Sequence, residues 1–540
     1  MATNGPGSPK PSQTACSRIN TANGAVIGAG IGAIAGGLIF GKSGAVLAGG
    51  LIGAALGGII GNDFDQRACA MEKIAAKSGT RIEQESIVWR EPVAPAAGSS
   101  TQGTKDVPIG QITRWQDSGF ATGSSELTAP ARSYFTQVAG LYAPAPPDPQ
   151  KLNQLQGTER DQYVAYVKAR NEMPILLVGN TDDVGDSRTN QRLSEARAKS
   201  VGEVFQAAGI DPKRVFYWGA GETRPVADNR AEDGRSRNRR VDIIEFQDTD
   251  RLFAYLQSEK PNTQYYREAE PRPSPRPSAA PSPKPATKKA APPPAASDEQ
   301  APGLPVAANT AGTAPTASAP EAEVSPAPVA RSEPPAKKKA SKAQVDFDGT
   351  PVTGALPSLL DQVGGPKLPV ISLGLISSAF AAAPPAATCT EDRARQGGTV
   401  KSLATGKAIS AYNTAEFLPG LNNVAWGAEV NDHLIALSGV GVVRSNTKPV
   451  SNPTVEIYPR WSGVSNKSTA KPTYTLATTV NTYEGKDGFI YRVFIESDQA
   501  PLSCLDILIP YSGFKAEAGR IHYYAGGSEY FANYAPKLLR

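Results

Sequence analysis

The stretch GNTDDVGDSRTNQRLSEARAKSV, residues 179–201, decides the fold of the central part of this chain. It follows the apolar run ILLV at residues 175–178, and a second strand-like run, RVFYW, comes after it at residues 214–218. Apolar side chains recur mostly three or four positions apart over residues 190–208, a spacing that predicts a helix. The pattern therefore predicts a buried strand, a charged loop, a helix and a second strand. The charged side chains of the loop and the helix include Asp182, Asp183, Asp186, Arg192 and Arg197.

These charges have two interpretations. Loop acids and helix arginines are common on protein surfaces, where Asp182 would cap a turn and Arg197 would form a weak surface ion pair. The second interpretation is a site for a ligand that carries both an amine and a carboxylate.

The pattern around this stretch extends into an α/β domain over residues 107–250. Gly209 is expected to end the helix, and the Asp211-Pro212 step prevents its restart. Strands that alternate with helices predict a small α/β sandwich, interrupted by an insertion at residues 144–173. The other expected elements are an edge strand or strand end at residues 119–124, helices at 127–142 and near 158–170, and strands at 174–178 and 241–246.

Length and composition predict several domains. The chain has 540 residues, more than one hydrophobic core usually serves. Its 47 prolines and 52 glycines are spread unevenly, so part of the length is linker sequence. The net charge of only +5 argues against a nucleic-acid-binding function.

The first region, residues 16–70, carries a glycine repeat. Glycines recur every fourth residue in two runs, Gly24, Gly28, Gly32 and Gly36, and then Gly49, Gly53, Gly57 and Gly61. On a helix this spacing produces a glycine face, which lets helices approach closely in a bilayer. We therefore expect a glycine-zipper helical hairpin that inserts into a membrane, with homo-oligomers formed through the zipper. The alternative is a flexible Gly/Ala-rich tether.

Three regions follow the α/β domain. Residues 266–345 are rich in Pro, Ala, Ser and Lys, cannot bury a core and predict a disordered linker. Residues 367–386 resemble a secretory signal peptide, which indicates either that two exported proteins are fused here or that this is a buried strand or a short membrane-interacting segment. Residues 387–540 contain many short alternating runs punctuated by Gly, Asn and Asp, and predict an all-β domain of unknown role.

The cysteines and histidines constrain the chemistry. Cys16 and Cys69 lie in the first region, and Cys389 and Cys504 lie in the last, a layout compatible with two local disulfides. The only histidines, His433 and His522, lie beside apolar or aromatic residues. No spacing indicates a metal site, a cofactor site or a catalytic nucleophile, so we expect neither cofactor nor metal and no enzyme activity.

Three ordered motifs carry a resemblance to a known family. The quoted stretch, then GAGETRPVADN at residues 219–229 and GRSRNRRVDI at residues 234–243, together resemble the OmpA-like domain, the peptidoglycan-binding module of envelope proteins. The resemblance covers residues 120–246. A glycine-zipper segment followed by such a domain is also similar to glycine-zipper OmpA-like envelope lipoproteins.

The resemblance implies a ligand and a set of binding residues. The family binds the stem peptide of peptidoglycan, in particular diaminopimelate, whose side chain ends in an amine and a carboxylate. In the matching positions Asp182 receives the ammonium group and Arg197 the carboxylate, which a planar guanidinium can bind through two hydrogen bonds. The remaining expected peptidoglycan-binding positions are Thr181, Asn190, Ser194 and Arg239. One departure is that Phe120 is followed by Ala121, where the family often has an aspartate.

Two functions follow from these observations. The first is a non-catalytic envelope protein that anchors a membrane or an envelope complex to peptidoglycan, in the outer membrane of a Gram-negative bacterium facing the periplasm, or alternatively in the inner membrane. The second is a structural subunit of a secretion or conjugation apparatus, in which the OmpA-like domain docks envelope-complex proteins.

Overall fold

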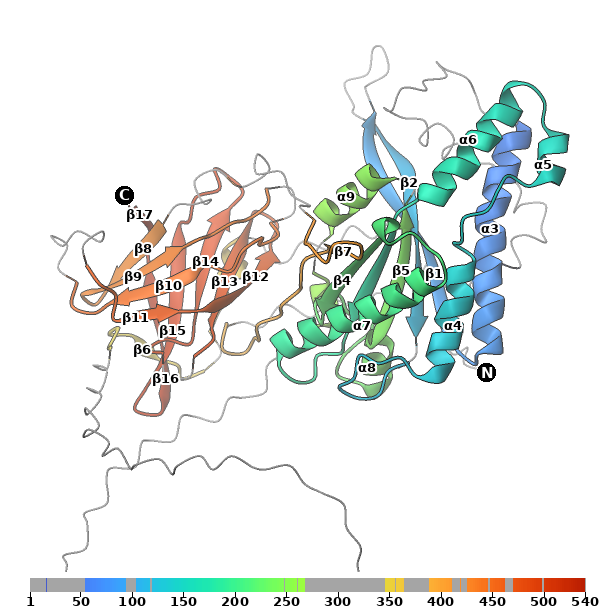
Figure 1. Ribbon diagram of the computed structural model, residues 1–540. Helices are drawn as coiled ribbons and strands as arrows, with labels where there is room; N and C mark the ends of the chain where they lie inside the picture. Colours follow the sequence, from blue (N-terminus) through green and yellow to red (C-terminus); the bar gives the residue numbers. More distant parts are fainter. Residues whose placement is uncertain are drawn as a thin grey trace, which may run out of the picture. The chain divides into compact units, whose positions relative to one another are not determined.

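The computed structural model describes two folded regions, an α/β domain and a C-terminal β region (Figure 1). The described residues are Cys16, 54–93, 103–116, 119–246, 248–259, 261–267, 345–354, 356–363, 388–409, 418, 425–444, 447–461, 470–497 and 500–539. The signal-like segment at residues 367–386, nearly all of the linker at 266–345 and most of the glycine repeat lie outside these residues.

A six-stranded sheet forms the centre of the α/β domain, in the order β1-β2-β5-β3-β4-β7. Only β3 and β4 are parallel; every other neighbouring pair is antiparallel. The strands are β1 (Arg81–Val93), β2 (Gly103–Gln116), β3 (Ile175–Asn180), β4 (Val215–Gly221), β5 (Arg240–Phe246) and β7 (Lys401–Ser402). The last of these strands comes from the C-terminal half of the sequence.

Helices cover both faces of this sheet. One buried cluster packs the sheet against α4 and α7 and includes Phe135, Val201 and Phe205, whereas a second packs it against α9 and includes Leu252 and Leu256. The helices are α3 (Ala54–Lys77), α4 (Ala129–Gly140), α5 (Pro149–Gln154), α6 (Thr158–Glu172), α7 (Ser187–Ala207), α8 (Glu232–Asn238) and α9 (Thr249–Ser258). Short 3-10 turns are η1 (Pro212–Arg214) and η2 (Thr263–Tyr265).

Most expected elements of this domain are confirmed. The helices predicted at 127–142, 158–170 and 190–208 are α4, α6 and α7, and the three predicted strands from residue 174 onward are β3, β4 and β5. Asp186 begins α7 as its N-cap, since its side chain accepts a hydrogen bond from the Thr189 backbone N–H. Gly209 follows the helix with φ of 89°, as a C-terminal glycine cap requires.

The strand expected at residues 119–124 is wrong. In this segment only Phe120 forms an isolated bridge, to Leu127. The backbone is instead satisfied in turns, with Ser124 N–H bonded to Ala121 O and Thr128 N–H bonded to Gly119 O. The β1–β2 hairpin takes the sheet position beside β5, so the segment serves as the entry to α4.

The amino-terminal region shows one of its expected features. Cys16 and Cys69 form a disulfide, as predicted, and Cys69 lies within α3. This helix includes Gly57 and Gly61 of the second glycine run, while the first run lies outside the described residues. Within the part of the chain that the structure describes, no helix combines the length and apolar character that a membrane span requires.

The C-terminal β region is a sandwich of two sheets, which confirms the predicted all-β class. The first sheet has the order β11-β10-β9-β8-β17 and the second β12-β13-β14-β15-β16-β6. Their bounds are β6 (Thr350–Pro351), β8 (Ala425–Val430), β9 (His433–Ser438), β10 (Thr454–Tyr458), β11 (Tyr474–Leu476), β12 (Thr478–Glu484), β13 (Gly488–Ile495), β14 (Cys504–Pro510), β15 (Ala518–Ala525), β16 (Ser528–Tyr534) and β17 (Lys537–Leu539).

Alternating side chains of both sheets form the core of this sandwich. Ile435 and Leu437 of β9 join Tyr491 and Val493 of β13 in one buried cluster, as aligned sheets with inward-facing alternate residues require. Phe347 belongs to the same cluster, so the sandwich includes residues that precede position 387. The second predicted disulfide, Cys389–Cys504, links the segment after residue 387 to β14.

The close packing of α7 on β3 generates a stability prediction. A Cβ added to Gly179 would lie 2.0 Å from the backbone oxygen of Ser194, and backbone cannot move aside as a flexible side chain can. We expect Gly179→Ala to lower the free energy of unfolding by about 3 kcal/mol or more, measured by urea denaturation. Gly140→Ala is the matched control, because nothing lies within 4 Å of an added Cβ in α4. It should raise stability by about 0.5–1 kcal/mol; equal effects of the two substitutions would contradict the close packing.

Candidate functional site

The loop between β3 and α7 presents the carboxylate of Asp182. One carboxylate oxygen accepts a hydrogen bond from the Val184 backbone N–H at 3.1 Å, which fixes a tight turn. The other pairs with Nη1 of Arg239 at 2.7 Å. Arg239 lies just before β5 and also contacts Glu232 of α8 at 2.9 Å. Asp182 and Arg239, 57 positions apart in the sequence, therefore form one partly exposed ion pair.

Arg197 lies on α7, close to this ion pair, and is only 7% exposed. Its guanidinium stacks over the Phe120 ring at 5.0 Å, and its Nε donates to the Ser124 carbonyl at 3.0 Å. Burial lowers the pKa of Arg197, while the nearby charge of Asp182 opposes that shift and Arg239 reinforces it. Among the described residues Arg197 forms no ion pair, so the surface ion pair that would account for it without a ligand is not found.

The arrangement of these three side chains determines what they can bind. Arg239 is shared by two carboxylates, whereas Arg197 keeps its Nη groups for a further acceptor. A guanidinium held over an aromatic ring keeps its planar donor groups for a carboxylate. Asp182 can accept a cation beside Arg239. The site therefore offers one cationic and one anionic position on the same side of α7.

Three of the expected binding residues have structural roles. Ser194 is fully buried, and its hydroxyl accepts a hydrogen bond from the Gly221 backbone N–H at 2.8 Å, which ties α7 to β4. Thr181 is buried, with its backbone N–H bonded to Gly221 O. Asn190 holds the loop from inside, because its amide donates to the Val184 carbonyl at 3.1 Å and to Glu222 at 2.7 Å. Of the six expected residues, the structure groups Asp182, Arg197 and Arg239.

Comparison with known proteins relates part of this chain to a known family. Residues 146–239 match the OmpA family. The chain contains an OmpA-like domain. It is 43% identical over 83 residues to Outer membrane protein A of Bordetella avium, and 50% identical over 70 residues to the outer-membrane lipoprotein YfiB of Pseudomonas aeruginosa. The peptidoglycan-binding protein ArfA of Mycobacterium bovis is 35% identical over 78 residues.

The matches to these three relatives are short. They cover 15%, 13% and 14% of this chain, respectively. They cover 43%, 42% and 24% of the relatives, so the chain spans less than half the length of each of these proteins.

Sequence reasoning missed the buried residues that hold the loop between β3 and α7 in place. Glu222 has a side chain with no exposed surface and binds Asn190, and the buried Asp183 pairs with Arg267 at 3.1 Å. Glu222 lies in the motif GAGET. A carboxylate directly after a strand was the sequence signal that could have indicated its role. Arg393 also reaches the loop, but no local pattern in the sequence connects it to residues about 200 positions earlier.

The histidines lie apart from this site. His522 is buried in β15 and pairs with Glu529 at 3.0 Å, while His433 accepts a hydrogen bond from the backbone N–H of Arg460. In the described ranges of the chain, no group of three or more His, Cys, Asp or Glu side chains could hold a metal ion.

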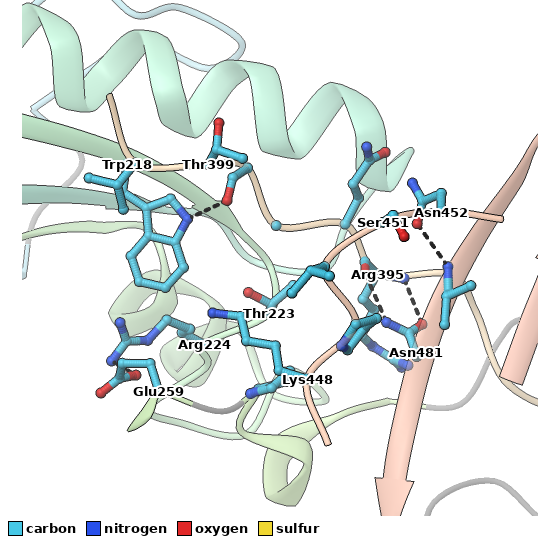
Figure 2. A pocket seen from close by; sticks show the side chains of 18 of the residues that line it. Trp218, Thr223, Arg224, Glu259, Arg395, Thr399, Lys448, Ser451, Asn452 and Asn481 are labelled. Carbon is cyan, nitrogen blue, oxygen red and sulfur yellow. Dashed lines mark hydrogen bonds and ion pairs between the residues drawn. The ribbon is translucent and has the colours of Figure 1, made fainter. Parts of the chain in front are cut away.

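A separate cavity of about 310 Å³ lies beside β4, and its lining includes Trp218, Arg224, Glu259 and Lys448 (Figure 2). The Trp218 indole N–H donates to the Gly398 carbonyl at 2.8 Å, and Nζ of Lys448 lies 5.4 Å from the indole ring centroid. Arg224 and Glu259 pair at 2.5 Å. None of the three grouped site residues lines this cavity, which is therefore distinct from the Asp182 site.

Burial in this cavity lowers the pKa of Lys448 to about 8, from an ordinary value near 10.5. The unfolded chain then binds more protons between these two values, so Lys448 makes stability rise with pH in that window. We expect Lys448→Met to be more stable than wild type near pH 7, by at most about 3 kcal/mol, with a difference that shrinks as the pH approaches 10.5. Urea denaturation across this pH range measures the effect.

The exposed turn lysine provides the control for this pH series. Lys486→Met removes an exposed lysine between β12 and β13. Its stability difference from wild type should stay constant over the same range. A constant difference for Lys448→Met as well would contradict the burial of its charge.

Proposed function

We propose that this protein is a non-catalytic envelope protein that anchors a membrane or an envelope complex to peptidoglycan through the diaminopimelate stem peptide. The observation that carries the proposal is the grouping of Asp182 in the loop after β3, Arg197 on α7 and Arg239 just before β5. An amino-acid terminus presents an ammonium and a carboxylate on one carbon, and these three side chains present the complementary charges.

Each residue has a distinct role in this proposal. Arg197 receives the ligand carboxylate, because its Nη groups have no carboxylate partner in the described structure and its ring contact orients them. Asp182 receives the ammonium group, at the oxygen that its turn does not use. Arg239 holds Asp182 in place and adds a second cation for the ligand carboxylate.

The expected affinity of a single site is modest. Hydrogen bonds to charged groups contribute about 1.5–3 kcal/mol each, and the Asp182–Arg239 pair must partly rearrange when a ligand enters. Peptidoglycan is a polymer that repeats the stem peptide, so several copies bound to one sheet of wall hold far more strongly than one. A membrane-bound protein with self-association through its glycine repeat would supply those copies.

The relatives support a location in the cell envelope. Two of them are named as outer-membrane proteins and a third as peptidoglycan-binding. We infer a Gram-negative envelope and, between its membranes, favour the outer membrane with the OmpA-like domain facing the periplasm. A subunit of a secretion or conjugation apparatus, whose OmpA-like domain docks proteins, is the alternative that the binding experiment decides.

Sedimentation of the full-length protein with purified diaminopimelate-type peptidoglycan tests the proposal. Wild type should pellet, whereas Asp182→Ala and Arg197→Ala should each bind about 10-fold more weakly or worse, since each removes one charge-assisted contact. Thermal unfolding confirms that the variants are folded.

Arg192→Ala is the matched control for this experiment. Arg192 is exposed on the same helix, and its guanidinium donates a hydrogen bond to the Thr189 hydroxyl at 3.4 Å, so its loss should leave sedimentation unchanged. Wild-type protein that stays in the supernatant would reject wall anchoring and favour the docking alternative. Variants that pellet as well as wild type would reject the assigned residues.

A further inference from the structure

Residues 388–409 connect the C-terminal β region to the sheet of the OmpA-like domain. Within them β7 pairs antiparallel with β4 and forms the edge of that sheet (Figure 1). Two flanking backbone bonds extend the pairing, from Gly398 N–H to Gly219 O at 2.8 Å and from Leu403 N–H to Val215 O at 2.9 Å. The segment therefore supplies backbone partners that β4 would otherwise lack at its edge.

The side chains of this segment pack on both faces of the sheet. Leu403 packs against the cluster beneath α7, and an added Cβ on Gly202 of α7 would lie 3.1 Å from it. Val400 and Ile409 join the cluster beneath α9. Lys401 pairs with Glu195 of α7. The C-terminal half thus contributes to both cores of the OmpA-like domain.

Arg393, at the leading end of the segment, binds the loop that carries Asp182. Its Nη1 donates to the Asp183 carbonyl at 2.5 Å, and its Nη2 donates to the Gly185 carbonyl at 2.7 Å. Nη2 also pairs with the Glu222 carboxylate at 3.0 Å. One guanidinium therefore joins two successive bends of the loop to a fixed buried charge on the adjacent strand end.

The Glu222 carboxylate needs this partner. Burial raises its pKa, and the charge of Arg393 is the largest opposing cause, followed by the hydrogen bond from Asn190. Asn190 contacts the loop carbonyls from α7 and Arg393 contacts them from the C-terminal region. The loop is held at its carbonyls by these two side chains, while the Asp182 carboxylate is directed to Arg239.

Arg393 is itself held rigidly by the C-terminal β region. Its neighbour Asp392 pairs with Arg395 at 2.6 Å and with Arg492 of β13 at 3.0 Å, all three side chains being buried. The Cys389–Cys504 disulfide ties the same segment to β14. The position of Arg393 is thus set by the sandwich, and the loop position follows from it.

We propose that the C-terminal β region completes the peptidoglycan-binding site, with Arg393 as a positioning residue that fixes the loop at residues 181–187. This inference rests on the proposed function of that loop. Arg393 donates to loop carbonyls and not to the ligand, so it acts through the placement of Asp182. Wall binding by the OmpA-like domain then depends on a correctly docked C-terminal sandwich.

The test compares full-length wild type with Arg393→Ala by two independent measurements. Hydrogen–deuterium exchange at residues 181–190 reports whether the loop is fixed, and sedimentation with diaminopimelate-type peptidoglycan reports binding. We expect exchange in this loop to accelerate at least 10-fold and binding to weaken about 10-fold, while exchange in β13 and β14 stays unchanged. Arg393→Lys keeps the charge but loses the guanidinium that donates to two loop carbonyls. Its loop exchange and its binding should therefore lie between the values of wild type and Arg393→Ala.

Arg444→Ala is the matched control, because Arg444 is exposed in the sandwich and lies outside residues 388–409. It should leave both measurements at the wild-type values. Unchanged loop exchange in Arg393→Ala would overturn the positioning role, as would wild-type binding by a variant with a loosened loop. Failure of wild type itself to sediment would reject wall anchoring, and the exchange result would then still decide whether Arg393 fixes the loop. Unfolding of Arg393→Ala as a whole would show as accelerated exchange in β13 and β14 and would contradict a local role.

Discussion

The close approach of α7 to β3 and β4 is the constraint on which the OmpA-like domain depends. Gly179 and Gly219 leave no room for a side chain between the strands and the helix backbone. The Ser194 hydroxyl then bonds directly to the Gly221 backbone N–H. Because the helix lies this close to the strand ends, Arg197 faces the loop that leaves β3. A site that joins a loop carboxylate to a helix guanidinium requires that spacing.

Around this contact the domain separates charges that support the loop from charges that face solvent. Asp183, Glu222 and Asn190 are buried and bind partners within the protein. Asp182 and Arg239 form a partly exposed pair, and Arg197 is buried along its length but without an ion partner in the described structure. A buried cation without a counterion costs folding stability, which is characteristic of binding sites. Buried residues therefore fix the loop, while Asp182, Arg239 and Arg197 keep the charges that a zwitterionic ligand needs.

The two halves of the chain are joined more closely than the sequence pattern indicates. A strand from the C-terminal half completes the OmpA-like sheet, and one arginine from the same segment reaches the loop next to Asp182. The sandwich also takes in Phe347, which precedes the signal-like segment in the sequence. The C-terminal half thus contributes a strand and a loop-binding arginine to the OmpA-like domain.

The sequence by itself determined the local structure, because periodicity, caps and breakers act within a few residues. The alternation of strand and helix, the end of α7 at Gly209 and the all-β class of the C-terminal half all follow from neighbouring side chains, whereas α7 begins at Ser187, a few residues before the expected start near residue 190. The ordered motifs also indicated Asp182, Arg197 and Arg239. Only the tertiary structure decided which chemically suitable residues meet. Ser194 and Asn190, which the motifs place among the expected binding residues, also hold α7 and the loop in place. Residues 119–124 form turns because β2 occupies the neighbouring sheet position, and Arg393 reaches the loop from 210 positions away. Such contacts depend on how whole sheets pack, which short-range patterns do not encode.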